Sequence, residues 1–122
     1  MTNLELVASE LKAVKKKHQK FVDCFVKAYD VNRNRYVKAK RRNALHIKDV
    51  RDDLQGYRDD LKWSQDNKLV DVADILLTKI CEAEEAYLTD DLAHARQELA
   101  QCAAVCIQAM EYVEKEMGNK TK

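Results

Sequence analysis

Residues 69–110 read LVDVADILLTKICEAEEAYLTDDLAHARQELAQCAAVCIQAM, and this stretch decides the fold. Apolar residues recur every three or four positions on both sides of Thr89-Asp90-Asp91, which predicts two amphipathic helices joined by a short connection. The first helix is expected over about 69–88, and the second from the Thr89-Asp90-Asp91 cap to just before Gly118, a residue type that commonly ends helices. Their inward faces are predicted to be Leu69, Val72, Leu76, Ile80, Ala83 and Tyr87, then Leu92, Ala95, Leu99, Cys102, Cys106, Met110, Val113 and Met117.

The rest of the chain also favours helices. It has 122 residues with no proline and two glycines, which leaves little turn chemistry for a sheet. A long N-terminal helix is expected to open with the capping box Thr2-x-x-Glu5, and its apolar stripe extends to Phe25 and Tyr29. Beyond it, the chain either continues as helix or breaks near residues 31–34. A further helix is predicted from the apolar residues Ile47, Val50, Leu54, Tyr57 and Leu61, followed by a connection at 64–67. The predicted class is all-α, a bundle of about four helices in one compact domain.

Four polar side chains stand out on the two helices of residues 69–117. Lys79 and Glu82 are one turn apart on the first helix, as are Glu98 and Gln101 on the second. If the helices fold back antiparallel about Thr89-Asp90-Asp91, Glu82 lies level with Glu98 and Lys79 with Gln101. Two facing carboxylates suit a hard cation, whereas the same four residues can also form a cluster of salt bridges and hydrogen bonds. Both interpretations stay open at this point.

A basic segment lies between Val31 and Lys48. It contains seven cationic residues and no acidic one, although the formal net charge of the whole chain is only +1. Such a segment favours an anionic partner, such as a phosphate, a nucleic acid or an acidic protein; a solvated helix face is the alternative. The candidate binding residues are Arg33, Arg35, Lys38, Lys40, Arg41, Arg42 and Lys48.

Three stretches carry a resemblance to a known family: DLKWSQDN at residues 60–67, ILLTKICEA at 75–83 and RQELAQCAAV at 96–105. From about Ile47 to Glu116 the chain resembles the MazG-like superfamily of all-α nucleoside triphosphate pyrophosphohydrolases, especially its small phage and bacterial forms. The resemblance covers a little over half of the chain. The organisation expected with it is an N-terminal helix with the basic segment over 1–45, a MazG-like helical core over 46–117 and a frayed tail over 118–122.

In that family, an ExxE motif on one helix and an ExxD motif on the next hold Mg²⁺. The ion positions a nucleoside triphosphate while water attacks the α-phosphorus and pyrophosphate leaves. The resemblance therefore implies Glu82 and Glu98 as catalytic residues and Glu82, Glu98 and Gln101 as ligands of Mg²⁺. A glutamine at the last of these positions also occurs in phage-like relatives.

Lys79 departs from the family pattern, because it stands where the family has its first acidic residue. An ammonium group there repels a divalent cation and would pair with Glu82 one turn away. Glu85 would complete a second ExxE motif if the metal site moved one turn along the helix, and Asp71 or Asp74 could supply a ligand from the other end.

The remaining reactive or aromatic residues are expected to be structural. The four cysteines are predicted to be thiols that pack as small hydrophobic residues, Trp63 to anchor the core, and His18, His46 and His94 to lie at or near the surface. No apolar run reaches the roughly 20 residues of a membrane span and no signal peptide is visible, so a cytoplasmic protein is expected.

Two functions follow as hypotheses. The first is a degenerate MazG-like nucleotide pyrophosphohydrolase or a nucleotide-binding descendant, dependent on Mg²⁺ if active and built as a homo-oligomer. The alternative is a non-catalytic helical interaction protein of phage or mobile-element origin, which binds nucleic acid or an acidic protein through its basic segment.

Overall fold

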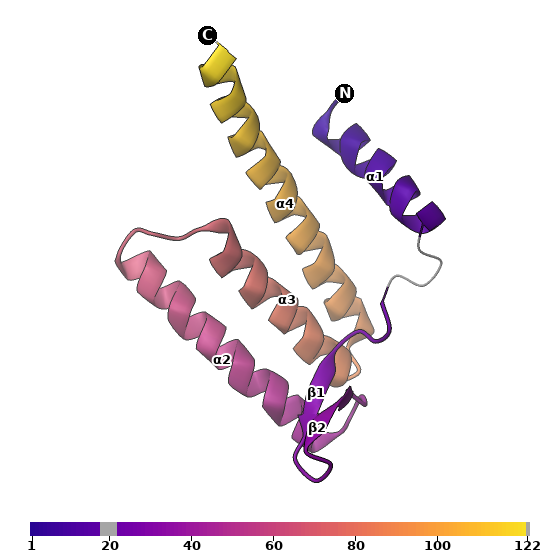
Figure 1. Ribbon diagram of the computed structural model, residues 1–122. Coiled ribbons are helices and arrows are strands. Elements are labelled where there is room, and N and C mark those ends of the chain that lie inside the picture. Colours follow the sequence, from indigo (N-terminus) through magenta and orange to yellow (C-terminus); the bar gives the residue numbers. More distant parts are fainter. Residues whose placement is uncertain (18–21, 122) are drawn as a thin grey trace. The chain divides into compact units, whose positions relative to one another are not determined.

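The computed structural model describes residues 1–17 and 22–121 and confirms an all-α fold, to which it adds one small two-stranded hairpin. Figure 1 shows the helices and the hairpin in chain order. The elements are α1 Asn3–Lys17, β1 Lys27–Asp30, β2 Arg35–Lys38, α2 Ala44–Asp66, α3 Val72–Leu88 and α4 Leu92–Thr121.

The contacts divide the chain into two compact units. One unit contains Met1–Asp23 and Cys106–Lys122, and the other contains Cys24–Val105, so that α4 extends through both. This grouping differs from the predicted division after residue 45. In the first unit, α1 begins with the predicted capping box: the backbone N–H of Glu5 donates to Thr2 Oγ1 at 3.1 Å, and the Thr2 hydroxyl donates to Glu5 Oε1 at 3.0 Å. All candidate site residues belong to the second unit.

The chain after α1 forms a hairpin, which settles the choice that the sequence left open near residues 31–34. The prediction that Phe25 and Tyr29 continue the first helix was wrong, because burial alternates here with a period of two: Val26 and Ala28 are buried, and Tyr29 is exposed. The strands are antiparallel, with Tyr29 opposite Tyr36. At the turn, the Asp30 carboxylate accepts hydrogen bonds from two backbone N–H groups, and Asn34 adopts φ 52°, which asparagine tolerates well.

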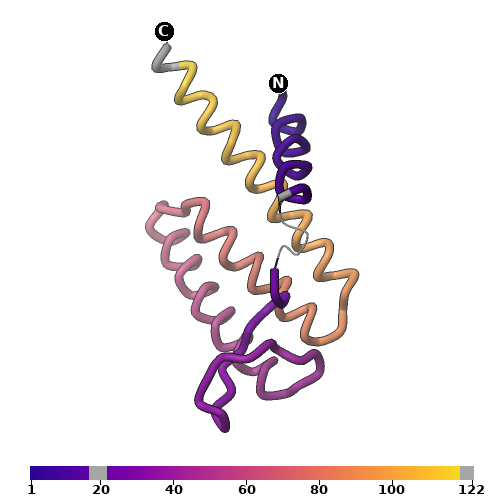
Figure 2. Tube along the Cα trace, turned by 45° about the vertical axis from the view of Figure 1, so that its right-hand side comes forward, coloured from indigo at the N-terminus to yellow at the C-terminus, as the bar shows by residue number. Residues whose placement is uncertain are grey.

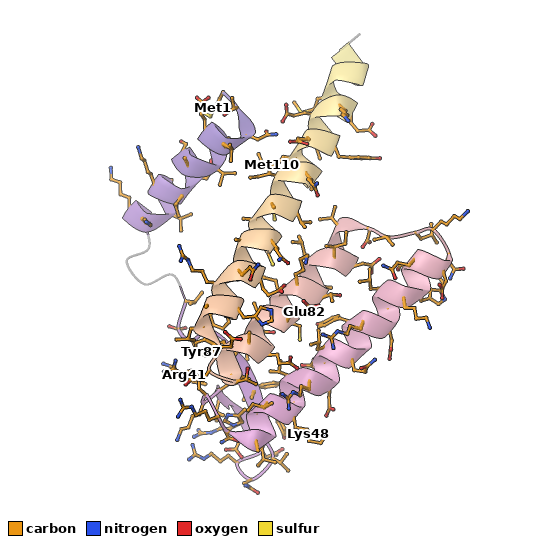
Figure 3. All side chains as sticks on the ribbon, turned by 180° about the vertical axis from the view of Figure 1, so that it is seen from behind. Met1, Arg41, Lys48, Glu82, Tyr87 and Met110 are labelled. Carbon is orange, nitrogen blue, oxygen red and sulfur yellow. The ribbon has the colours of Figure 1, made fainter. Side chains whose placement is uncertain are left out.

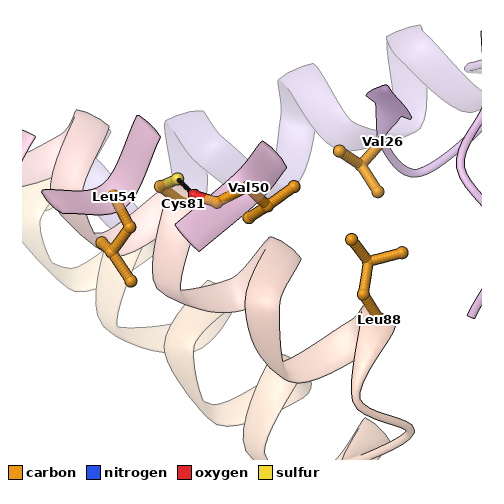
Figure 4. Close-up of a cluster of buried hydrophobic side chains, with 5 residues drawn as sticks. All are labelled: Val26, Val50, Leu54, Cys81 and Leu88. Carbon is orange, nitrogen blue, oxygen red and sulfur yellow. Dashed lines mark hydrogen bonds between the residues drawn. The ribbon is translucent and has the colours of Figure 1, made fainter. Parts of the chain in front are cut away.

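The core of the second unit lies where the hairpin meets α2 and α3. Val26, Val50, Leu54, Cys81 and Leu88 form one buried cluster (Figure 4). The Cys81 thiol donates to the carbonyl oxygen of Val50 at 3.5 Å, and burial raises the pKa of that thiol to about 12. Cys81 therefore behaves as a packing residue, as predicted.

Helices α2, α3 and α4 follow one another by chain reversals, which the tube in Figure 2 shows. Helix α3 begins three residues later than predicted, with a capping box in which the side chain of Asp71 accepts from the backbone of Asp74 and the side chain of Asp74 accepts from that of Asp71. It ends at a short turn in which Asp90 has φ 69°. Helix α4 continues through Gly118 to Thr121, so the predicted end before Gly118 was wrong; the glycine does not take the left-handed conformation.

The predicted inward faces of α3 and α4 were only partly right. The residues that the sequence placed inside but that are exposed include Leu69, Val72, Ile80, Leu92, Leu99, Val113 and Met117. Because α3 is apolar around most of its circumference, its sequence does not single out the stripe that meets its neighbours. The buried residues of α3 and the first part of α4 are Thr78, Cys81, Ala83, Ala86, Leu88, Ala95, Glu98 and Cys102.

Candidate functional site

The polar quartet of α3 and α4 comes together in the second unit. The ammonium group of Lys79 donates to Gln101 Oε1 at 2.8 Å, which fixes these two residues at one level of the antiparallel pair. One turn away, Glu82 and Glu98 face each other closely enough for the charge of one to affect the protonation of the other. The register expected from the sequence therefore describes this pair of helices.

Glu98 is the buried member of the quartet, with 7 % of its surface exposed. One of its carboxylate oxygens, Oε1, lies 3.1 Å from His94 Nε2 on the same helix. The other oxygen, Oε2, is buried and has no hydrogen-bond partner among the residues that the structure describes. A buried carboxylate oxygen without a donor is unfavourable, so this atom marks a place where a proton or another donor fits.

Glu82 lies half-buried between α2 and α4. Arg58 of α2 approaches it, with 3.9 Å between Arg58 Nη2 and Glu82 Oε1. Burial, followed by the negative charge of nearby Glu98, raises the pKa of Glu82, while Arg58 and Lys79 oppose this shift. Two ionised carboxylates have no proton to share, whereas a protonated Glu82 can donate to Glu98.

These residues do not fit the Mg²⁺ site that the resemblance implies. The amide oxygen of Gln101 already accepts a hydrogen bond from Lys79, whose ammonium group would repel the ion. Glu85, the substitute ligand, turns instead to α2, where its Oε2 lies 3.1 Å from Arg51 Nε. Asp71 and Asp74 are used in capping α3. Within residues 1–17 and 22–121, no group of three or more His, Cys, Asp or Glu side chains is arranged to hold a metal ion.

The basic segment divides into three parts, all of them exposed at the surface. Arg33, Arg35 and Lys38 lie on the turn and second strand of the hairpin; Lys40, Arg41 and Arg42 lie on the connection to α2; Lys48 lies on α2 itself. Four of the seven have acidic partners: Arg33 pairs with Asp30, Arg41 and Arg42 both pair with Asp90, and Lys48 pairs with Asp52. In the described part of the chain, Arg35, Lys38 and Lys40 have no ion-pair partner.

The hairpin combines these cations with aromatic rings. Tyr29 and Tyr36 pack edge to face with 5.3 Å between ring centroids, and the Lys27 ammonium lies 5.3 Å from the centroid of the Tyr36 ring. Tyr36 is 63 % exposed, so much of its ring remains accessible. Lys27 and Tyr36 were not among the predicted site residues. The alternation of Lys27-Ala28-Tyr29 and Arg35-Tyr36-Val37 was the sequence signal that could have found them.

A cleft of about 530 Å³ lies beside the hairpin, lined by Ala39, Lys40, Arg41, Arg42, Tyr87 and Asp90. The guanidinium of Arg41 lies 5.6 Å from the centroid of the Tyr87 ring, and Figure 3 shows these two residues together, with Glu82 farther along α3. The backbone N–H of Arg42 donates to the carbonyl oxygen of Leu88 at 2.7 Å, which ties the basic connection to the end of α3. Asp90, absent from the predicted site, supplies the only acidic side chain among the residues that line this cleft.

Three other expectations need correction. His46 is buried rather than superficial, and its Nδ1 accepts a hydrogen bond from the backbone N–H of Lys40 at 2.9 Å, which offsets the cost of burying this nitrogen. Trp63, expected to anchor the core, is 60 % exposed. Cys106 is exposed, unlike Cys81 and Cys102. His18 lies outside the described residues.

Within the described residues, no helix is long and apolar enough to cross a membrane. Comparison of the chain with protein-family models, with curated proteins and with solved structures gives no match.

Proposed function

We propose that this protein binds nucleic acid through the exposed face of its hairpin and does not hydrolyse nucleotides. The observation that carries this proposal is the exposed Tyr36 ring, which shares one face of the hairpin with Lys27 and Lys38, two cations with no acidic partner in the described part of the chain. Cations attract the phosphate backbone, and an exposed aromatic ring offers a surface on which a base stacks. An acidic protein would need the charges but not the ring, so the ring favours nucleic acid.

The state of the polar quartet supports a non-catalytic role. Lys79 and Gln101 bind each other, and His94 contacts Glu98, so most of the polar groups that would face a metal–nucleotide complex have partners within the chain. The quartet therefore contributes to the packing of α3 against α4. The hairpin, by contrast, presents exposed cations and an exposed aromatic ring to a ligand.

The test is fluorescence anisotropy with labelled single-stranded and double-stranded DNA and RNA, measured over a range of KCl concentrations. Affinity should fall steeply with salt, and Lys38→Gln should reduce the slope of log K against log [salt] by about one, because one phosphate contact is lost. Lys62→Gln is the matched control, since Lys62 is an exposed lysine on α2, away from the hairpin. Equal effects of the two substitutions, or binding to an acidic protein but to no nucleic acid, would contradict the proposal.

A second candidate is a MazG-like, nucleotide-binding descendant. The observation that favours it is the facing pair Glu82 and Glu98, with a buried oxygen of Glu98 that has no partner among the described residues. The measurement is pyrophosphate release from nucleoside triphosphates with Mg²⁺ or Mn²⁺. Activity that disappears in Glu98→Ala would establish this candidate, whereas a silent wild type and metal binding gained only in Lys79→Glu would show that the site has been lost.

A further inference from the structure

The cleft beside the hairpin holds one carboxylate between two guanidinium groups. Asp90 Oδ1 lies 3.1 Å from Nη1 of Arg41, and Asp90 Oδ2 forms a close ion pair with Nη2 of Arg42. Both oxygens of the carboxylate are therefore engaged by arginines that are adjacent in sequence. Proteins also bind phosphoryl oxygens by placing two guanidinium groups around one small anion.

The backbone holds the two arginines and Asp90 in place. Arg42 and Asp90 adopt φ values of 64° and 69°, in the left-handed region that residues other than glycine occupy less often. The hydrogen bond from the backbone of Arg42 to Leu88 keeps the two turns together. Arg41 rests on the ring of Tyr87, which in turn stacks on Phe25 at 4.5 Å between centroids. At Asp90 this conformation ends α3, where the backbone N–H of Asp91 donates to the carbonyl oxygen of Ala86 at 2.8 Å. At Arg42 it is unfavourable, and such strain is often found beside a binding site.

The charge of the cleft is not balanced by Asp90. Lys40, Arg41 and Arg42 provide three positive charges against its single negative one. The Arg42 side chain is 77 % exposed, so an incoming anion can reach it. Ion pairs at the protein surface contribute little to stability. Replacing the Asp90 carboxylate by another anion therefore costs little free energy. A phosphate group carries more oxygens than a carboxylate and more negative charge, and it would use the third cation as well.

We propose that Arg41 and Arg42 form a binding site for a phosphoryl group, which the Asp90 carboxylate occupies as an internal anion until a phosphate displaces it. The source of the phosphoryl group is either the backbone of a nucleic acid or free inorganic phosphate. In the first case the inference rests on the proposed function, and the site gives the hairpin a second contact on the same strand.

Two probes separate these sources. Inorganic phosphate is titrated into ¹⁵N-labelled protein, and the NMR signals of the Arg41 and Arg42 backbone and side chains are followed. A labelled single-stranded DNA of 12 nucleotides is followed by anisotropy. Arg42→Gln should weaken binding of the responsive probe at least fivefold. Asp90→Asn should tighten it about threefold to tenfold, because the internal competitor is lost while the side chain keeps its shape and its tolerance of positive φ.

The matched control is Asp52→Asn. It removes the same charge from an exposed ion pair, that of Lys48 with Asp52, outside the cleft. A change of less than twofold there, against a clear gain in Asp90→Asn, supports the site. Equal gains would reduce the effect to net charge and overturn the proposal, as would weaker binding in Asp90→Asn.

The outcomes also separate this inference from the proposed function. Binding of phosphate at Arg41 and Arg42 without any binding of DNA upholds the site and rejects the nucleic-acid function. Binding of DNA that Arg42→Gln and Asp90→Asn leave unchanged, with no response of the Arg41 and Arg42 signals to phosphate, upholds the function and overturns the site. No response of the Arg41 and Arg42 signals to phosphate, together with no binding of DNA, overturns both.

Discussion

The quartet between α3 and α4 and the basic surface of the hairpin and cleft are built from similar charged residues, yet they differ in what surrounds them. In the quartet, Lys79 contacts Gln101, and Glu98 is buried against His94. On the basic surface, the cations are exposed, and those that have partners share them with solvent. The difference teaches that burial and internal pairing, rather than residue type, separate charges that support the fold from charges that can meet a ligand.

The largest expected effect comes from a substitution inside the quartet. Lys79→Met should lower the free energy of unfolding by about 1–3 kcal/mol, because Gln101 loses its donor and the two glutamates lose a neighbouring positive charge. Lys38→Met, on the hairpin, should change it by less than about 0.5 kcal/mol. Urea denaturation followed by circular dichroism measures both. Similar losses in the two variants would mean that the quartet has no special structural role.

The next effect concerns the exposed ring of the hairpin. Tyr36→Ala should weaken binding to single-stranded DNA by about fivefold to a hundredfold, the range expected when one base loses its stacking partner. Tyr36→Phe keeps the ring and should bind within about twofold of the wild type, by the same stacking argument. Anisotropy titrations compare the three proteins. Equal weakening in both variants would point to the tyrosine hydroxyl group and against stacking.

A smaller effect follows from the raised pKa of Glu82. The folded protein holds this proton more tightly than the unfolded chain does, so the stabilisation is complete below the ordinary pKa of 4.5 and is lost as the pH rises through the raised value. The free energy of unfolding of the wild type should therefore fall across this window more than that of Glu82→Gln. Glu114→Gln, which removes an exposed carboxylate, is the control. Parallel curves for wild type and Glu82→Gln would refute the assignment.

The smallest expected effect is at Lys48, the one predicted binding residue on α2. Its ammonium group pairs with Asp52 one turn along the helix at 2.8 Å, and this hydrogen bond and charge raise the pKa of Lys48. Lys48→Gln should therefore change the affinity for DNA less than Lys38→Gln does. A larger loss at Lys48 would extend the binding surface from the hairpin onto α2 and blur the contrast between the two regions.

Much of the quartet could be predicted from the sequence, because it depends on helix periodicity and on one turn. Counting from Thr89-Asp90-Asp91 places Lys79 level with Gln101, and the structure joins them by a hydrogen bond. Helix periodicity does not decide whether the residues implied as Mg²⁺ ligands are free to bind the ion. Whether Gln101 is available to a metal, and whether Glu85 faces α4 or Arg51 of α2, depends on neighbours that periodicity does not specify.

The basic segment shows the opposite case. Its charge was evident from the sequence, but its conformation was not, because residues 22–38 combine a helical spacing of apolar residues with a strand-like alternation. The buried positions of Val26 and Ala28 became the stronger constraint once α2 and α3 provided a core to cover. Two short strands then replaced a continued helix.

By itself, the sequence determined the all-α class, the capping box at Thr2, and the register of α3 with α4, since these depend on composition and on residues close together in the chain. Only the tertiary structure decided which apolar face of α3 is buried, that Lys79 donates to Gln101, and that Asp90 lies between Arg41 and Arg42, 48 positions from the latter. The physical reason is that hydrogen-bonding and capping preferences act locally, whereas burial and ion pairing depend on which distant segments the core brings together.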